Sequence, residues 1–167
     1  MRKSMAGGCA AFIAALALMV SSLPATPMAA LADADTVLSS TFDNGIEGWS
    51  AYNGNGGDCY VSNDNGRLAL TVNNVGELSY SVQVGCDGIP LVKDGVYRLH
   101  FDISSTTDRT VEVMIQQNGG SYSNYTWKSL RLTSAVQTVD YEFTMESDTD
   151  NAAKLAFNCG MQNADGS

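Results

Sequence analysis

Short runs of alternating apolar and polar residues cover most of the chain from Asp35 onward. Gly, Asn and Asp separate these runs, and no segment of this region keeps the apolar period of about 3.6 residues that an amphipathic helix needs. Period-two alternation is typical of strands that bury one face. The pattern therefore predicts an all-β sandwich of two antiparallel sheets, with strands at 36–43, 48–53, 58–63, 67–73, 78–86, 96–105, 109–118, 125–133, 137–145 and 152–159.

Two Xaa-Gly pairs mark turns between these strands. Asn65-Gly66 lies between the predicted strands 58–63 and 67–73, and a two-residue type I′ turn requires positive φ at both of its central positions. Asp94-Gly95 precedes the predicted strand 96–105 in a similar way. The first pair predicts a tight hairpin, and the second predicts the turn at which a long strand begins.

Two of the predicted strands have one apolar face and one face of mixed character. In 109–118 the first face carries Val111, Val113 and Ile115, and in 152–159 it carries Leu155 and Phe157. We expect these residues in the core, because alternate side chains of a strand point to opposite sides of the sheet. The other faces are either solvated or form a binding surface, and they carry Glu112, Met114, Gln116, Asn118, Lys154, Ala156 and Asn158.

The first 34 residues have the three parts of a secretory signal peptide. Arg2 and Lys3 form a positive start, 10–20 is apolar, and the small-residue sites Ala30-Leu31-Ala32 and Ala32-Asp33-Ala34 follow. The apolar run is shorter than the roughly 20 residues that span a membrane, which disfavours the alternative of a retained anchor. We therefore expect a signal peptide at 1–34, one domain at 35–167, and a secreted or cell-surface location without membrane insertion.

Composition and charge exclude several classes of protein. The 167 residues carry a formal net charge of −9, with 44% apolar and 16% charged residues. This composition is typical of a globular domain rather than a disordered one. Lys and Arg form no cluster, so the chain lacks the basic surface that binds phosphate backbones. We expect no nucleic-acid partner.

Catalytic and metal-binding patterns are absent from the sequence. His100 is the single histidine, and it alternates outward in a charged row with Arg98 and Asp102. Neither a Gly-x-Ser-x-Gly motif nor a phosphate-binding loop occurs. The cysteines after residue 34 are Cys59, Cys86 and Cys159, and they are too far apart in the sequence for a zinc site. Because there are three of them, the sequence leaves open which two could form a disulfide. We expect no catalytic residue and no metal ligand among these groups.

Four segments, in order, resemble a known family. They are Thr41-Phe-Asp-Asn-Gly-Ile-Glu-Gly-Trp-Ser-Ala-Tyr52, Asp94-Gly-Val-Tyr-Arg-Leu-His-Phe-Asp102, Gln117-Asn-Gly-Gly-Ser-Tyr122 and Ala156-Phe-Asn158. Together they resemble the carbohydrate-binding modules of families four and nine, which are cellulose- and xylan-binding modules of bacterial glycoside hydrolases. The resemblance covers residues 40–160. It implies a jelly-roll sandwich of the galactose-binding-domain-like type, in which one concave sheet holds a polysaccharide chain.

The resemblance also implies which residues bind the sugar. They are Tyr52, Tyr80, Glu112, Met114, Asn118, Tyr122, Lys154 and Asn158. Glu112 and Lys154 differ from the Arg and Gln of the glucan-binding relatives. Alternation by itself places Tyr80 in the core and Gln83 outside, whereas the resemblance places Tyr80 in the cleft, and we favour the cleft. Trp49 is expected in the core, and Trp127 is left unplaced.

The implied function is non-catalytic binding of a β-glucan or xylan-like chain, by a monomeric N-terminal module of a secreted glycoside hydrolase. The alternative is a surface adhesin or a structural β-sandwich module that binds a protein or a host glycan, because one fold can have many functions. Relatives also end in a further strand, which this sequence lacks, and often hold a structural Ca²⁺ near the position of Asp43. We therefore expect a fragment of a longer protein and consider Ca²⁺ a possible ligand.

Overall fold

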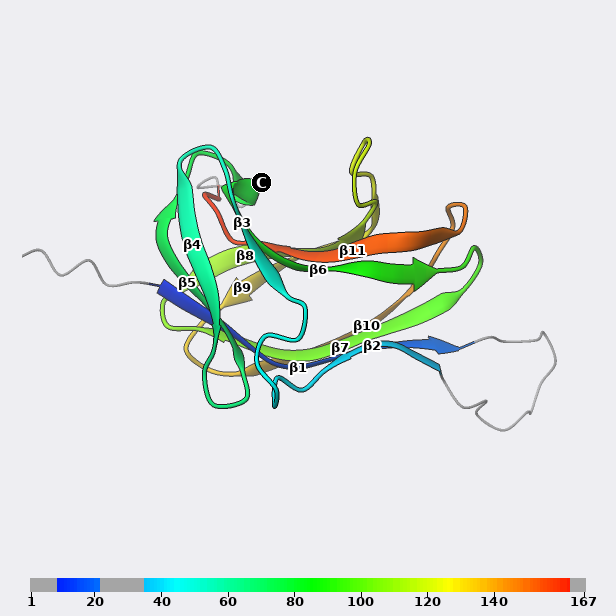
Figure 1. Cartoon of the computed structure of the whole chain (residues 1–167), viewed down its shortest axis with the longest axis horizontal. Coiled ribbons are helices and arrows are strands. Elements are labelled where there is room, and N and C mark those ends of the chain that lie inside the picture. Colours follow the sequence, from blue (N-terminus) through cyan, green and yellow to red (C-terminus); the bar gives the residue numbers. More distant parts are fainter. Residues whose placement is uncertain (1–8, 22–34, 163–167) are drawn as a thin grey trace, which may run out of the picture.

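The protein is a sandwich of two antiparallel β-sheets. Its computed structural model describes residues 9–21 and 35–162. One sheet has the strand order β10-β7-β1-β5-β4, with β2 paired to β1, and the other has the order β3-β6-β11-β8-β9. Figure 1 shows the sheets as two layers, with β6 and β11 in one and β7 and β10 in the other. The strands are β1 (Cys9–Ser21), β2 (Asp35–Ser40), β3 (Ser50–Asn53), β4 (Gly57–Asn63), β5 (Leu68–Val75), β6 (Val82–Leu91), β7 (Val96–Ser105), β8 (Arg109–Gln116), β9 (Asn124–Leu132), β10 (Gln137–Thr144) and β11 (Asp150–Asn158).

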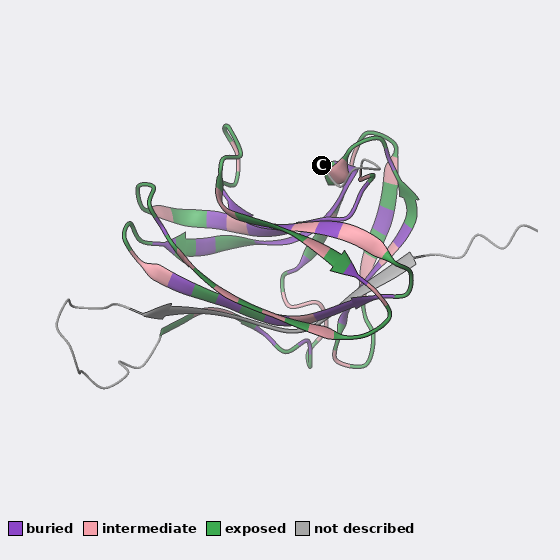
Figure 2. Cartoon of the chain, turned by 180° about the vertical axis from the view of Figure 1, so that it is seen from behind, coloured by how far each residue is buried: buried purple, intermediate pink, exposed green. Residues whose placement is uncertain are grey.

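The alternation in the sequence correctly predicts the strands from β2 to β11. Burial alternates along several of them, as the banded colouring in Figure 2 shows, and in β7 every second residue from Tyr97 to Ile103 is buried. The Asn65-Gly66 hairpin is also confirmed, because φ is 53° at Asn65 and 75° at Gly66. Both residues have the left-handed conformation that a type I′ turn requires.

The predicted strand 78–86 is wrong at its start. Residues Ser79–Ser81 form a short 3₁₀ helix, η1, and β6 begins only at Val82. The Ser81 side chain stabilises this turn, because its Oγ accepts a hydrogen bond of 3.0 Å from the Leu78 N–H. A Ser or Asn side chain that bonds to nearby backbone competes with a sheet ladder in this way.

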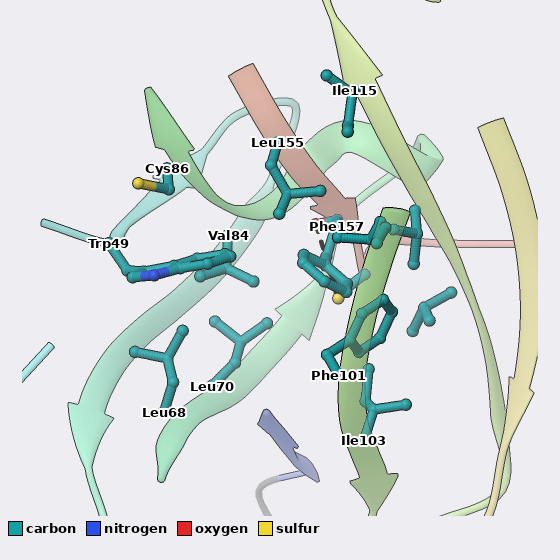
Figure 3. Packing of buried hydrophobic residues seen from close by; sticks show 14 of the residues in the cluster. Trp49, Leu68, Leu70, Val84, Cys86, Phe101, Ile103, Ile115, Leu155 and Phe157 are labelled. Carbon is teal, nitrogen blue, oxygen red and sulfur yellow. Dashed lines mark hydrogen bonds between the residues drawn. The ribbon is translucent and has the colours of Figure 1, made fainter. Parts of the chain in front are cut away.

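Large aromatic side chains fill the space between the sheets. The rings of Trp49 and Phe157 lie 5.9 Å apart, and those of Phe157 and Phe101 meet edge to face at 5.3 Å (Figure 3). Trp49 is only 1% exposed, and its indole N–H donates a hydrogen bond of 3.0 Å to Ser40 Oγ. The expectation that Trp49 is a core residue is therefore confirmed.

Cys59, Cys86 and Cys159 are buried. Cys59 lies on β4, Cys86 on β6, and Cys159 follows β11. Burial, together with a smaller effect of the nearby Asp58, raises the pKa of the Cys59 thiol to about 11. A thiol with a raised pKa is a poor nucleophile. Cys159 is only 2% exposed.

The segment Cys9–Ser21 forms a strand that the sequence did not predict. It is the apolar part of the predicted signal peptide, and in the structure it pairs with β5 and β7 within the larger sheet. Residues 1–8 and 22–34, which include the predicted cleavage sites, lie outside the described residues. The signal peptide stays a prediction. Among the described residues, no helix has the length and apolar character needed to cross a membrane.

Candidate carbohydrate-binding cleft

A cleft of about 620 Å³ lies on the outer face of the five-stranded sheet. Each of the eight residues that the family resemblance implied for sugar binding lines this cleft. The structure brings the eight residues together in one cleft, and their role in binding sugar remains a prediction. The complete lining is Tyr52, Tyr80, Gln83, Glu112, Met114, Gln116, Asn118, Tyr122, Asn124, Trp127, Lys154 and Asn158.

A row of polar side chains crosses the floor of the cleft. Gln83 lies opposite Asn158 in the β6–β11 register, and Asn158 lies opposite Glu112 in the β11–β8 register. Gln83 Nε2 donates to Asn158 Oδ1 at 2.8 Å, and Asn158 Nδ2 donates to Glu112 Oε2 at 2.9 Å. This row, Gln83–Asn158–Glu112, is called the polar row below. Each side chain in it is held by its neighbour on the next strand.

Beside the polar row lies a row of smaller and more apolar residues. Gly85 pairs with Ala156, Ala156 with Met114, and Met114 with Trp127. Residues directly opposite each other in an antiparallel pair share one face of the sheet. We call these four residues the apolar row.

Lys154 lies across the apolar row at Gly85. A Cβ added at Gly85 would lie 2.7 Å from Lys154 Cε and 2.8 Å from the Leu155 carbonyl oxygen. The absence of a side chain at Gly85 therefore makes room for the aliphatic stem of Lys154. The ammonium group has no carboxylate partner among the residues that the structure describes. It is a hydrogen-bond donor available to a ligand.

Three exposed tyrosines stand at the rim. Tyr52 is 50% exposed, Tyr80 47% and Tyr122 59%. η1 places Tyr80 outside the alternation of β6, so Tyr80 lines the cleft, as the resemblance implied, and is not a core residue. Gln83 lines the cleft too, as alternation predicted. Tyr122 has φ of 53° in the loop between β8 and β9, and its N–H donates to the Gly119 carbonyl at 3.1 Å. A positive φ at a bulky residue is costly and is often found at binding sites.

Sequence reasoning missed Trp127, Gln116 and Asn124 as cleft residues. A register irregularity falls between Ile115 and Gln116, where β8 pairs with β9. Such a bulge places one extra residue in a strand and reverses the alternation beyond it. Simple alternation therefore could not tell which side of β9 faces the cleft. The available signal was the pair Gln116 and Asn118 on the mixed face of the predicted strand 109–118.

The cleft has the chemistry of a binding site. Glu112 is the one carboxylate among the described residues that line it, whereas glycoside hydrolysis ordinarily requires two. His100 lies on the other sheet, on β7, where its Nδ1 is 3.3 Å from Asp140 Oδ2. The prediction that His100 belongs to a charged surface row is confirmed.

The surroundings of Asp43 give limited support for Ca²⁺. Asp43 Oδ2 and Glu47 Oε2 both accept hydrogen bonds from Thr41, at 2.9 and 3.0 Å. The nearby carbonyl oxygens of Phe42 and Gly45 accept from the Asn63 side-chain amide. Ca²⁺ takes six to eight oxygen ligands, and no group of three His, Cys, Asp or Glu residues suited to a metal occurs in the described ranges. The described residues thus do not form a complete site, and Ca²⁺ binding stays a prediction.

The comparisons with known protein families and with curated proteins agree with one another. A family profile described as a carbohydrate binding domain matches residues 34–166. The chain is 32% identical over 154 positions to Endoglucanase C of Cellulomonas fimi, covering 84% of this chain and 14% of the relative. It is 32% identical over 144 positions to the cellulose 1,4-beta-cellobiosidase of Acetivibrio thermocellus, covering 79% and 16%. The chain thus spans a small part of the length of these curated relatives.

Solved structures share the fold. One, described under "CBM4 structure and function", superposes with a TM-score of 0.68 at 23% identity, over 73% of this chain and 87% of that chain. The N-terminal cellulose-binding domain of Cellulomonas fimi β-1,4-glucanase C gives a TM-score of 0.52 at 28% identity, over 72% and 82%. These matches confirm the predicted β-sandwich.

The family match covers nearly the whole of the domain that contains the cleft. The chain is therefore a non-catalytic polysaccharide-binding module, and the expectation from the resemblance is confirmed. It belongs to the family of carbohydrate-binding modules that joins families four and nine.

Proposed function

We propose that the cleft binds a single β-1,4-linked glucan or xylan-like chain and that the module belongs to a secreted glycoside hydrolase. The observation that carries this proposal is the cleft itself, in which a hydrogen-bonded polar row and an apolar row lie side by side between exposed tyrosines. The names of the two curated relatives, an endoglucanase and a cellulose cellobiosidase, support a β-glucan as ligand.

The two rows fit the two kinds of surface that a sugar chain presents. Pyranose rings have apolar C–H faces, which stack on aromatic side chains, and rims of hydroxyl groups, which exchange hydrogen bonds. Asn158 and Gln83 are already oriented by their hydrogen bonds, so less side-chain entropy is lost on binding. Each net hydrogen bond contributes only about 0.5–1.5 kcal/mol. We therefore expect moderate affinity, built up over several sugar units.

The rows also indicate the direction of the bound chain. Both run across the strands, through β6, β11 and β8, and the apolar row continues to Trp127 on β9. A glycan that follows them lies across the sheet, with Tyr52 and Tyr80 toward one end and Trp127 and Tyr122 toward the other.

The cellular role follows from the same proposal. The predicted signal peptide at 1–34 would direct the protein out of the cell, where plant-type polysaccharides occur. A module that stays on the polymer raises the effective concentration of an attached catalytic domain. Monomeric binding is sufficient for this role.

Calorimetry with cellohexaose and xylohexaose tests the proposal. We expect Tyr52→Ala and Tyr122→Ala each to weaken binding roughly tenfold, because stacking contributes about 0.5–1.5 kcal/mol beyond burial. Tyr60→Ala is the matched control, since Tyr60 is equally exposed but lies on β4 in the other sheet. Equal affinity in all three variants and the wild type would overturn the cleft assignment. Binding confined to host-type glycans on an array would favour the adhesin alternative.

A further inference from the structure

The apolar row changes character at its β6 end. From Trp127 through Met114 to Ala156 the row offers apolar side chains. At Gly85, opposite Ala156, there is no side chain, and Lys154 Cε lies 2.7 Å from the position that a Cβ would take. The ammonium nitrogen is bonded to this carbon. A sugar chain that follows the row across β9, β8 and β11 therefore meets a cation at β6.

Two further hydrogen-bond donors lie beside this cation. Ser50 on β3 is exposed and lies opposite Gly85, so it shares the cleft face of the sheet. Gln83, two residues from Gly85 on β6, lines the cleft. Its amide nitrogen carries two hydrogens, of which Asn158 Oδ1 accepts one. The second amide hydrogen, the Ser50 hydroxyl and the Lys154 ammonium thus supply donors from neighbouring positions on β6, β3 and β11.

The carboxylates of the described residues leave the Lys154 ammonium without an ion pair. Glu112 is the one carboxylate among the described residues that line the cleft, and it lies on β8, two strands from β6, or about 10 Å at the usual strand spacing. Its Oε2 already accepts a hydrogen bond from Asn158. Asp87, further along β6, is exposed and makes no ion pair with this lysine. The ammonium is therefore available to an anionic group of a ligand.

We propose that Lys154, together with Ser50 and Gln83, forms a subsite for the carboxylate of a uronic acid unit on an otherwise neutral sugar chain. The proposal rests on the proposed function, because the cleft must hold the chain for the carboxylate to reach β6. Hydrogen bonds between an ammonium and a carboxylate are roughly twice as strong as those between neutral groups. One uronic acid unit therefore adds affinity and fixes the position of the chain along the cleft.

A densely charged chain does not fit the same cleft. Units next to the one at Lys154 would lie toward β8, where Glu112 stands, and like charges that meet across an interface disfavour binding. The whole protein also carries a formal net charge of −9, which repels polyanions. The cleft therefore favours isolated uronic acid units, such as single glucuronic acid substituents on a xylan-like chain, over a polyuronate.

Calorimetry with matched pairs of oligosaccharides tests the subsite. The probes are xylohexaose with and without one glucuronic acid substituent, and cellohexaose with and without one unit oxidised to glucuronic acid. We expect the acidic member of a pair to bind about tenfold more tightly than the neutral member at low salt, and the difference to shrink in 0.5 M salt. The pair that responds shows whether a substituent or the main chain carries the carboxylate. Equal affinity within both pairs would overturn the subsite alone, whereas failure of all four probes to bind would overturn the proposed function.

Lys154→Met assigns the effect to the lysine. Methionine keeps an unbranched apolar stem beside Gly85 but carries no charge, so the acidic probe should lose its advantage while the neutral probe keeps its affinity. Lys128→Met is the matched control, because Lys128 Nζ lies 4.5 Å from the centroid of the Tyr141 ring and is not part of the described cleft lining. It should leave both affinities unchanged. An advantage of the acidic probe that survives in Lys154→Met would refute the assignment.

Hexagalacturonate tests the preference for isolated carboxylates. We expect the wild type to bind it more weakly than the singly charged probes, because one of its carboxylates would lie near Glu112. Glu112→Gln should bind it more tightly than the wild type does, since glutamine keeps an oxygen that can accept from Asn158 but removes the like charge. Tighter binding of hexagalacturonate than of the singly charged probes by the wild type would contradict this preference.

Discussion

Met114 on β8 lies directly opposite Trp127 on β9, and both side chains face the cleft. Met114 is almost completely buried, whereas Trp127 is 48% exposed. The methionine thus forms part of the cleft floor beside an indole ring that remains exposed. Large aromatic groups on a rigid sheet can contact sugar at little cost in conformational entropy. Trp127 therefore extends the apolar row by one position beyond the residues that the family resemblance implied.

Trp127→Ala is expected to weaken glycan binding about tenfold and to leave the melting temperature nearly unchanged. Trp49→Ala provides the contrast, because the buried Trp49 fills the core and its loss should cost about 3–5 kcal/mol of stability. The sequence has two tryptophans, so intrinsic fluorescence can separate them. In Trp49→Phe the remaining signal should change when cellohexaose is added, whereas in Trp127→Phe it should not. The reverse result would place the ligand away from β9.

Asn158 is expected to matter for both stability and binding. Its amide connects Gln83 to Glu112, and Asn158→Ala leaves both without their partner. A buried group without a hydrogen bond costs about 1–3 kcal/mol. We expect a lower melting temperature and weaker binding, whereas Asn118→Ala, in the exposed loop after β8, should affect binding alone.

A double-mutant cycle with Gln83→Ala measures the connection directly. The two residues are in contact, so the effects of the single changes on unfolding free energy should not add, with a coupling of about 0.5–3 kcal/mol. Chemical denaturation of the four proteins gives this value. Strict additivity would show that the polar row is not a coupled unit.

Gly85 is expected to tolerate no side chain. In Gly85→Ala the new Cβ meets Lys154 Cε at 2.7 Å and the Leu155 carbonyl oxygen at 2.8 Å. The lysine stem can move, but the backbone of β11 cannot move without disturbing its ladder. We expect destabilisation of about 1–3 kcal/mol. Gly85→Ala/Lys154→Ala removes only the first contact, so thermal melts should show partial recovery. Full recovery would mean that the backbone contact is unimportant.

The sequence predicted most of the fold because sandwich strands follow a simple physical rule. Most of these strands direct one face toward the core, and the alternation of apolar side chains records it, as in Val111, Val113 and Ile115. Alternation alone did not identify the eight candidate residues. They were identified because four motifs occur in the same order as in the family, and this order relates residues on strands far apart in the sequence, such as β8 and β11.

The sequence prediction failed where local structure departs from that rule. The Ser81 hydroxyl stabilises a 3₁₀ turn, so Tyr80 leaves the alternation of β6. The register irregularity between Ile115 and Gln116 interrupts the alternation, so alternation alone does not show on which face of the sheet Trp127 lies. Cys9–Ser21 has no strand pattern because the strand is determined by the edges of β5 and β7, which are far away in the sequence. Long-range pairing of this kind is invisible to local periodicity.

On the outer face of the larger sheet, one charged cluster makes stability depend on pH. Asp140 on β10 accepts a hydrogen bond of 2.7 Å from Arg98 Nε on β7. This bond is the main reason why the pKa of Asp140 is lowered to about 2, and the nearby His100 adds to the effect. The same bond raises the pKa of Arg98. Both partners are partly exposed, so the pair is screened by solvent and salt.

Asp140→Asn is expected to reduce the acid dependence of the melting temperature. A carboxyl whose pKa is lower in the folded than in the unfolded state stabilises the fold above the unfolded value, near 4. This contribution disappears as the pH falls toward 2. The difference in melting temperature between wild type and Asp140→Asn should therefore be largest at pH 5–7 and vanish near pH 2. Asp148→Asn is the matched control, because Asp148 pairs with Lys93 alone and is almost fully exposed. The difference in melting temperature between wild type and Asp148→Asn should be smaller at every pH. Adding 0.5 M salt should reduce the differences for both variants. A difference that stays constant from pH 6 to pH 2 would show that the pairing of Asp140 with Arg98 does not contribute.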